Sequence, residues 1–353
     1  MPRLTGPCIP VFLLSISTAV SMLAQDDAST STDNRDDPKA VKLANELGDV
    51  KFGENGQVVS LIINRAKLSD HELAGLESLK NLEYFSVHSY RFRGHGLRRI
   101  RGIASLTGLS LYCPVLTDKG LSSLDAQIGW KNLKRLRIIC PEISDAGLIH
   151  IRGLTGLQSL SIDHGDVTDE GIANFSEMAG LERLELNSTK VTGTGLKHLK
   201  RPEKLKTLKL YRSPINDEGL KEIGSFVNLE WLYLTETNVT DRGLTHLKSL
   251  KKLRRLDLDA TKVTDKGLAE LGHLPIEELS LSCTSFSSRG VGGVIVSSTS
   301  NAPQITDVGL VHLRGLMRLR KLDLQGTTVT GEGVKTLRST LPDLKVIHGF
   351  NLE

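Results

Sequence analysis

The chain repeats one pattern of apolar and polar positions along most of its length. Three apolar residues spaced as LxxLxL are followed, ten residues after the first, by VTDxGL and a short apolar tail; the clearest copy starts at Leu229. The first positions of the copies are Val58, Leu82, Leu106, Leu133, Leu157, Leu181, Leu205, Leu229, Leu253, Ile276, Ile295, Leu319 and Leu344. Most steps are 24 residues, so the sequence predicts an array of repeats instead of separate globules.

Each repeat combines two spacings, which predict a strand, a turn and a helix. The last two leucines of LxxLxL share one face of a strand, whereas GLxxLxxL has helical spacing. The Thr or the Asp of VTD is expected to begin the helix by accepting an unpartnered backbone N–H. No repeat can bury its apolar face alone, so the repeats must stack, with strands about 4.8 Å apart. The predicted fold is an α/β solenoid, a horseshoe of about 12–13 repeats with a concave parallel sheet and convex helices.

The N-terminus has the pattern of an export signal. Arg3 precedes an apolar run from Ile9 to Ala24, and we expect residues 1–24 to be a signal peptide cut after Ser21 or Ala24. The run is short for a membrane span, so we expect no stable membrane insertion and an exported location. An uncleaved N-terminal anchor is the alternative.

The remaining segments divide the chain further. Residues 25–37 hold five Asp and no apolar residue larger than Ala, which predicts a disordered acidic linker. Residues 38–57 are expected to cap the first repeat, and the solenoid covers 58–353. Its irregular part is 276–318, where a repeat beginning at Ile295 would place Ser at two Leu positions, so that a loop is the alternative to a degenerate repeat.

The repeats resemble those of secreted bacterial leucine-rich-repeat proteins of the planctomycete kind, which carry VTDxGLxxL units. The resemblance covers residues 38–353 and implies a horseshoe that binds partners without a common reaction. The repeats are also similar to the cysteine-containing repeats of F-box proteins. Thr often stands where those carry Cys, at Thr189, Thr237, Thr261, Thr284 and Thr327.

The chemistry-bearing residues favour binding over catalysis. The chain has no CxxC, HExxH or GxSxG motif, so we assign no catalytic residue, metal site or cofactor. Four histidines recur at one place of the repeat, which favours a structural role on the outer helices: His150, His198, His246 and His312. Lys and Arg total 45 against 41 Asp and Glu, a balance too even for a dedicated nucleic-acid binder, and no nucleic-acid partner is expected.

The concave sheet carries the expected binding site. The proposed partner-binding residues are Lys209, Tyr211, Trp231, Tyr233, Arg255 and Asp257, which fall on neighbouring strands. Exposed Trp, Tyr and Arg are enriched in binding hot spots, although ordinary cross-strand packing would also explain them. The expected partner is a protein or an anionic polymer.

Basic residues also gather where each helix returns to its strand, and stacking would align them. Two readings are a stripe that binds an acidic partner and a solvated edge. The residues are Lys131, Lys134, Arg135, Lys204, Lys206, Lys251, Lys252, Arg254, Arg255, Arg318, Arg320 and Lys321.

Three functions follow from these observations. The first is an exported, non-enzymatic protein-binding module. The second is an intracellular substrate adaptor of the F-box type, which needs an N-terminal docking domain that residues 38–57 are too short to supply. The third is a hydrolase acting on surface polymers, for which no convergent acid, base or nucleophile is visible.

Cys113 and Cys140 occupy the same position in consecutive repeats, seven residues after the first Leu. Parallel strands bring equivalent α-carbons to about 4.8 Å, a distance that permits a disulfide, but side chains in register point the same way. A disulfide and two free thiols therefore both remain open. Other repeats place Arg65, Ser89, His164 and Glu236 here, which predicts a partly exposed position.

Overall fold

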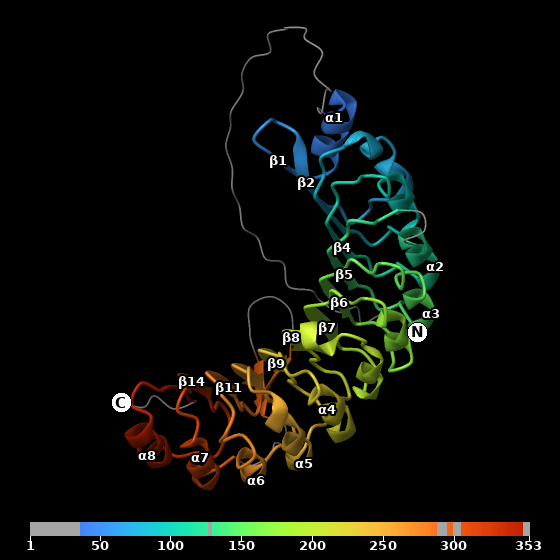
Figure 1. Cartoon of the computed structure of the whole chain (residues 1–353). Coiled ribbons are helices and arrows are strands. Elements are labelled where there is room, and N and C mark those ends of the chain that lie inside the picture. Colours follow the sequence, from blue (N-terminus) through green and yellow to red (C-terminus); the bar gives the residue numbers. More distant parts are fainter. Residues whose placement is uncertain (1–35, 126–128, 288–294, 299–304, 349–353) are drawn as a thin grey trace, which may run out of the picture.

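The computed structural model describes residues 36–125, 129–287, 295–298 and 305–348. The expected signal peptide and nearly all of the expected linker lie outside these residues. Within them, thirteen strands form one sheet, and all but the first pair run parallel. The strands line the inner side of a curved coil and the helices line its outer side (Figure 1).

The strands follow the LxxLxL pattern. In the copy beginning at Leu229, the side chains of Leu229, Leu232 and Leu234 are fully buried. Burying one such side chain contributes about 1.5–3 kcal/mol, and the same positions are filled in every repeat of the sheet. In sheet order the strands are β1 (Asp49–Phe52), β2 (Val58–Asn64), β3 (Tyr84–His88), β4 (Gly108–Tyr112), β5 (Arg135–Ile139), β6 (Ser159–Asp163), β7 (Arg183–Asn187), β8 (Thr207–Lys209), β9 (Trp231–Tyr233), β10 (Arg255–Asp257), β11 (Glu278–Ser280), β14 (Lys321–Asp323) and β15 (Lys345–Ile347).

The helices are short because a 24-residue turn of the coil leaves little chain for them. The α-helices are α1 (Pro38–Leu47), α2 (Asp118–Leu121), α3 (Asp145–Leu148), α4 (Asp217–Ile223), α5 (Asp241–Leu244), α6 (Asp265–Leu268), α7 (Asp307–Leu313) and α8 (Gly331–Thr340). Tighter 3-10 turns are Asp70–Leu73, Leu76–Ser78, His95–Arg99, Ser122–Leu124, Gly171–Phe175, Thr194–His198, Pro202–Lys204 and Thr245–Ser249. The two ten-residue helices, α1 and α8, stand at the two ends of the coil.

The segment from Asp36 to Phe52 packs over the first repeat. Asp36 is only 8% exposed, and its carboxylate accepts a hydrogen bond of 2.6 Å from the backbone N–H of Val58. Asp37 accepts the first N–H of α1, and β1 pairs antiparallel with β2. These contacts cover the first apolar layer of the coil.

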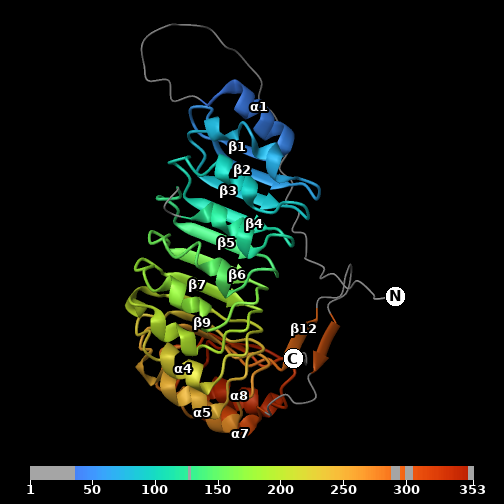
Figure 2. The same ribbon diagram turned by 90° about the vertical axis from the view of Figure 1, so that its right-hand side faces the viewer.

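The irregular stretch between Ile276 and Leu319 holds one repeat, so of the two alternatives, a degenerate repeat at Ile295 and a loop, the degenerate repeat is wrong. β11 pairs directly with β14, with Leu279 beside Leu322, so Ile295 contributes no strand to the sheet. Instead β12 (Thr284–Ser287) and β13 (Ile295–Ser298) pair antiparallel as an inserted hairpin. Figure 2 shows β12 standing clear of the sheet. An insertion therefore interrupts this repeat after its strand, and Ile305 to Leu310 resume it.

Candidate functional site

Outward-facing side chains of the sheet form columns that cross neighbouring strands. Side chains alternate along a strand, and parallel pairing in register places equivalent residues side by side. One column holds Lys209, Tyr233 and Asp257, and the next holds Thr207, Trp231 and Arg255. The repeat spacing thus gathers side chains that lie 24 residues apart in the sequence.

A ring and two cations form the centre of the concave face. The guanidinium carbon of Arg255 lies 5.1 Å from the ring centroid of Tyr233, and Nζ of Lys209 lies 5.4 Å from it. The ring of Tyr211 meets the same ring edge-on, with centroids 5.6 Å apart. We call Lys209, Tyr211, Tyr233 and Arg255 the Tyr233 cluster. The structure thus brings together four of the six residues expected from the sequence.

The other two expected residues differ in exposure. Trp231 is 37% exposed in the column beside Tyr233, where a partner can contact it. Asp257 is only 8% exposed, because its carboxylate accepts hydrogen bonds from Thr235 Oγ1 at 2.6 Å and from the backbone N–H of Asp259 at 3.2 Å. Asp257 therefore belongs to the framework under the cluster more than to its surface.

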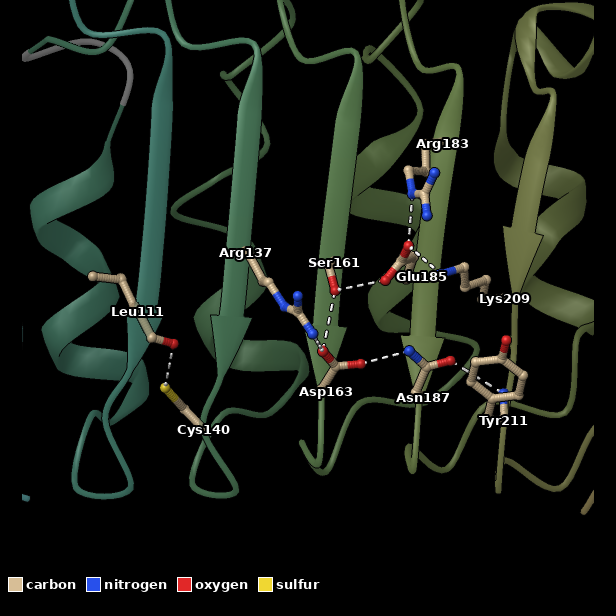
Figure 3. Close-up of polar contacts among 10 residues, drawn as sticks. All are labelled: Leu111, Arg137, Cys140, Ser161, Asp163, Arg183, Glu185, Asn187, Lys209 and Tyr211. Carbon is tan, nitrogen blue, oxygen red and sulfur yellow. Dashed lines mark hydrogen bonds and ion pairs between the residues drawn. The ribbon is translucent and has the colours of Figure 1, made fainter. Parts of the chain in front are cut away.

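A set of polar contacts continues from the Tyr233 cluster toward the N-terminal repeats, and of its members only Lys209 and Tyr211 were expected from the sequence. It crosses β5 to β8 and joins Arg137, Ser161, Asp163, Arg183, Glu185, Asn187, Lys209 and Tyr211 (Figure 3). Lys209 reaches Glu185 at 3.2 Å, and Glu185 also binds Arg183 at 2.6 Å. The contacts hold the outward side chains in fixed positions across four repeats.

The two carboxylates in this set of polar contacts, Asp163 and Glu185, differ in their ionisation. Burial raises the pKa of Asp163, and the hydrogen bond from Asn187 together with the charge of Arg137 only partly offsets that effect. Burial also acts to raise the pKa of Glu185, but bonds with Arg183 and Lys209 outweigh it and lower that pKa. Glu185 is therefore held as an anion between two cations.

A hollow of about 150 Å³ opens on the concave face across β10, β11 and β14. Its polar lining includes Asp257, Asp259 and Asp323, with Arg255 and Lys321 beside them. Burial and the charge of Asp257 raise the pKa of Asp259 to about 7. We therefore expect the charge of this hollow to change with pH near neutrality.

A second row of rings lies on the first repeats, outside the residues selected from the sequence. The ring centroids of His88 and Tyr90 are 5.7 Å apart, and those of His88 and Tyr112 are 6.1 Å apart. The guanidinium carbon of Arg137 lies 5.6 Å from the Tyr112 centroid. The signal for this row was present in the sequence, since His88 and Tyr112 share one register position.

Among the described residues, four of the twelve cations of the expected basic stripe form ion pairs with a neighbouring repeat. Lys206 binds Glu182 at 2.9 Å, and Arg255 binds Glu278 at 2.9 Å. Further pairs are Arg254 with Glu277 and Arg320 with Asp343. An acidic residue of the adjacent repeat thus neutralises part of the stripe, which favours the reading of a solvated edge.

Cys113 and Cys140 are free thiols in the structure, and the predicted partial exposure is wrong. Both side chains are fully buried. Cys113 Sγ donates to the carbonyl of Val87 at 3.7 Å. Cys140 Sγ donates to the carbonyl of Leu111 at 3.8 Å (Figure 3). Burial raises the pKa of Cys113 to about 12 and raises that of Cys140 as well. Each thiol points at the preceding strand.

The described part of the chain offers no group of three or more His, Cys, Asp or Glu side chains placed to hold a metal ion. Among the same residues, no helix is long and apolar enough to cross a membrane.

Comparison with known proteins agrees with this geometry. A leucine-rich-repeat family profile matches residues 317–337. The fold is a leucine-rich-repeat solenoid. An internalin (inlF) from Listeria monocytogenes superposes over 90% of this chain and 96% of its own, with a TM-score of 0.54 and 19% identity. An internalin C2 from the same species covers 56% of this chain and 78% of its own at 22% identity, with a TM-score of 0.45. No curated protein matches the sequence. The predicted horseshoe is confirmed.

Proposed function

We propose that the protein is an exported, non-enzymatic binding module that captures a protein partner on its concave face. The observation that carries this proposal is the Tyr233 cluster with Trp231 beside it. Aromatic rings and arginine, held in place on a rigid sheet, are the features of binding hot spots. The leucine-rich-repeat fold supports an interaction role, and sequence alone supports export.

The cluster is arranged to bind without reorganising. Tyr233 is held by Tyr211 and by two cations, and Lys209 is itself fixed by Glu185. A partner that docks here meets side chains whose rotamers are already restricted, so less conformational entropy is lost on binding. Trp231 then supplies exposed apolar surface beside the fixed ring.

The test is capture of partners from extracellular fractions by the chain lacking residues 1–24. Trp231→Ala combined with Tyr233→Ala should weaken capture by about 2 kcal/mol, or roughly 30-fold in Kd. The matched control is Val308→Ala combined with Met317→Ala, which removes exposed apolar side chains outside the concave sheet. Equal capture by all three proteins, with unchanged far-UV circular dichroism, would place the partner elsewhere.

Export has its own test. Intact mass of the full chain expressed in a Gram-negative host should show loss of residues 1–21 or 1–24. A full-length mass in the membrane fraction would instead indicate an uncleaved anchor.

A further inference from the structure

The repeat beginning at Leu82 departs from the VTD motif in a way that changes its charge. The motif reads Phe92, Arg93 and Gly94 here, so a cation replaces Thr and the acidic residue is lost. Residues 84–117 contain no Asp or Glu and include five arginines, Arg91, Arg93, Arg98, Arg99 and Arg101. In most other repeats acidic and basic side chains are interspersed.

Two of these arginines lie on the turn edge of the coil beside a cation of the preceding repeat. The backbone N–H of Tyr90 donates to the carbonyl of Ala66 at 3.0 Å, and that of Arg93 donates to Asp70 Oδ2 at 3.0 Å. These bonds place the turn carrying Arg91 and Arg93 alongside the turn carrying Lys67.

Lys67, Arg91 and Arg93 are all exposed, and among the described residues none of the three has an ion pair. Further along the coil, by contrast, an acidic residue of a neighbouring repeat pairs with cations such as Lys206 and Arg255. The carboxylate of Asp70 is engaged by the backbone N–H groups of Arg93 and Gly96. The turn edge therefore presents three exposed cations beside the carboxylate of Asp70, which leaves an excess of positive charge there.

The row of rings adjoins this charge. Tyr90, the residue before Arg91, is 54% exposed and contacts His88, whose ring in turn contacts Tyr112. Successive rings are tilted by 54° and 49°, so they do not form parallel platforms between which flat bases could stack. Neutral hydroxyls lie beside them, with Tyr84 Oη donating to Ser110 Oγ at 3.0 Å.

We propose that Lys67, Tyr90, Arg91 and Arg93, with the rings of His88 and Tyr112, form a second site that binds an acidic polysaccharide. The exposed ring of Tyr90 offers an apolar face to the C–H face of a sugar ring, and the hydroxyl of Tyr84, which donates to Ser110, can still accept a hydrogen bond from a sugar hydroxyl. Arginine forks bind carboxylates with two parallel hydrogen bonds, which is the chemistry of a uronic acid. The site goes beyond the proposed protein-binding function and lies on different strands from the Tyr233 cluster.

The experiment measures binding of the chain lacking residues 1–24 to polygalacturonate, with neutral galactan as the uncharged comparison. We expect binding to polygalacturonate alone, weakened about tenfold or more by Arg91→Ala with Arg93→Ala and also by Tyr90→Ala. The matched control is Lys251→Ala with Lys252→Ala, which removes the same charge from exposed residues far along the coil and should leave binding unchanged.

Several results would overturn the site. An equal loss of polygalacturonate binding in the Lys251/Lys252 control would indicate general electrostatic attraction. Unchanged binding by the Tyr90→Ala variant would show that the rings are not part of the site. Equal or tighter binding of polyglutamate or oligo-dT would point to an acidic protein or a single-stranded nucleic acid instead. The Trp231/Tyr233 variant should keep polygalacturonate binding, so failure of this site and failure of the proposed function are separately visible.

Discussion

Asp217 Oδ2 accepts a hydrogen bond of 2.7 Å from Oγ1 of Thr240, the residue of the next repeat at which α5 begins. Asp217 Oδ1 also accepts the backbone N–H of Thr240 at 2.9 Å. A Cβ on Gly243 would lie 2.5 Å from that same Oδ1 atom. Where a repeat carries the Asp of VTDxGL, its contact with the Thr and Gly of the following repeat therefore joins the two repeats.

Gly243→Ala should destabilise the protein by about 2 kcal/mol. The added methyl group would force the Asp217 carboxylate away from Thr240 and weaken two hydrogen bonds to a charged acceptor. Urea unfolding followed by circular dichroism would measure the change. Gly102→Ala is the matched control, because a Cβ there meets nothing within 4 Å. Equal stability of the two variants would show that the carboxylate relaxes without loss.

Asp259→Asn should stabilise the protein above neutral pH. Burial and the charge of Asp257 raise the folded-state pKa of Asp259 to about 7, whereas the unfolded value is about 4. A carboxyl whose folded pKa is raised contributes stability below about pH 4 that is lost as the pH rises through 7. The asparagine keeps an oxygen to accept the backbone N–H of Ser282.

At pH 8 the free energy of unfolding of the Asp259→Asn variant, measured by thermal unfolding, should therefore exceed that of the parent by on the order of 2 kcal/mol. This difference should vanish near pH 4. Asp343→Asn, at an exposed carboxylate, serves as the control and should show little pH dependence. A gain that is the same at both pH values would mean that charge is not its cause.

The coil could be predicted from the sequence because the apolar positions whose burial stabilises the fold recur about every 24 residues. Leu229, Leu232 and Leu234 show the layer that burial demands, and the observed sheet follows from it. The Thr or the Asp of the motif was expected to cap the helix, and Thr240 shows that the Thr does so. The second role of the motif, the contact of Asp217 with the next repeat, requires the stacking geometry and could not be inferred from one repeat.

The burial of Cys113 and Cys140 could not be predicted, because the backbone at this position of the repeat adopts different conformations in different repeats. His164 and Glu236 occupy that position with φ of 67° and 55°, so the backbone turns and the side chain is not buried. Cys113 and Cys140 are not among the residues with positive φ, and their side chains turn into the core. The exposed residues were therefore poor guides to the thiols.

Cys113 and Cys140 should both be recovered as thiols. Denaturing the chain lacking residues 1–24 without reductant, alkylating it and mapping its peptides by mass should show each cysteine alkylated separately. In the native protein the same reagent should react slowly with both, because each is buried and burial raises both pKa values. A cross-linked peptide containing both cysteines would contradict the geometry in which each thiol donates to a carbonyl.

The candidate site was predicted in part for a related reason. Lys209, Tyr233 and Arg255 lie on the neighbouring strands β8, β9 and β10, and the register of these strands alone brings them together. Their fixed orientation depends on Glu185, whose link to Lys209 arises from side-chain length and direction. Such contacts follow from three-dimensional packing and leave no periodic trace in the sequence.

The inserted hairpin should be dispensable for the fold. β11 already pairs with β14 in register, and Asp265 Oδ2 accepts from Thr306 Oγ1 at 2.6 Å across the insertion, as Asp217 does with Thr240. Deleting residues 285–303 would restore the 24-residue spacing and join Thr284, at the position of the buried Thr261, to the segment that starts the next turn.

We therefore expect the deletion to leave the free energy of unfolding within about 1 kcal/mol of the parent value, since long surface insertions alter loop entropy only slowly with length. Urea unfolding and far-UV circular dichroism would measure this. A matched deletion of residues 262–280, equally long but removing β11, should abolish cooperative unfolding. A large loss of stability from the first deletion would show that the hairpin packs against the coil and supports it. Retained stability with lost partner capture would instead assign the hairpin to binding.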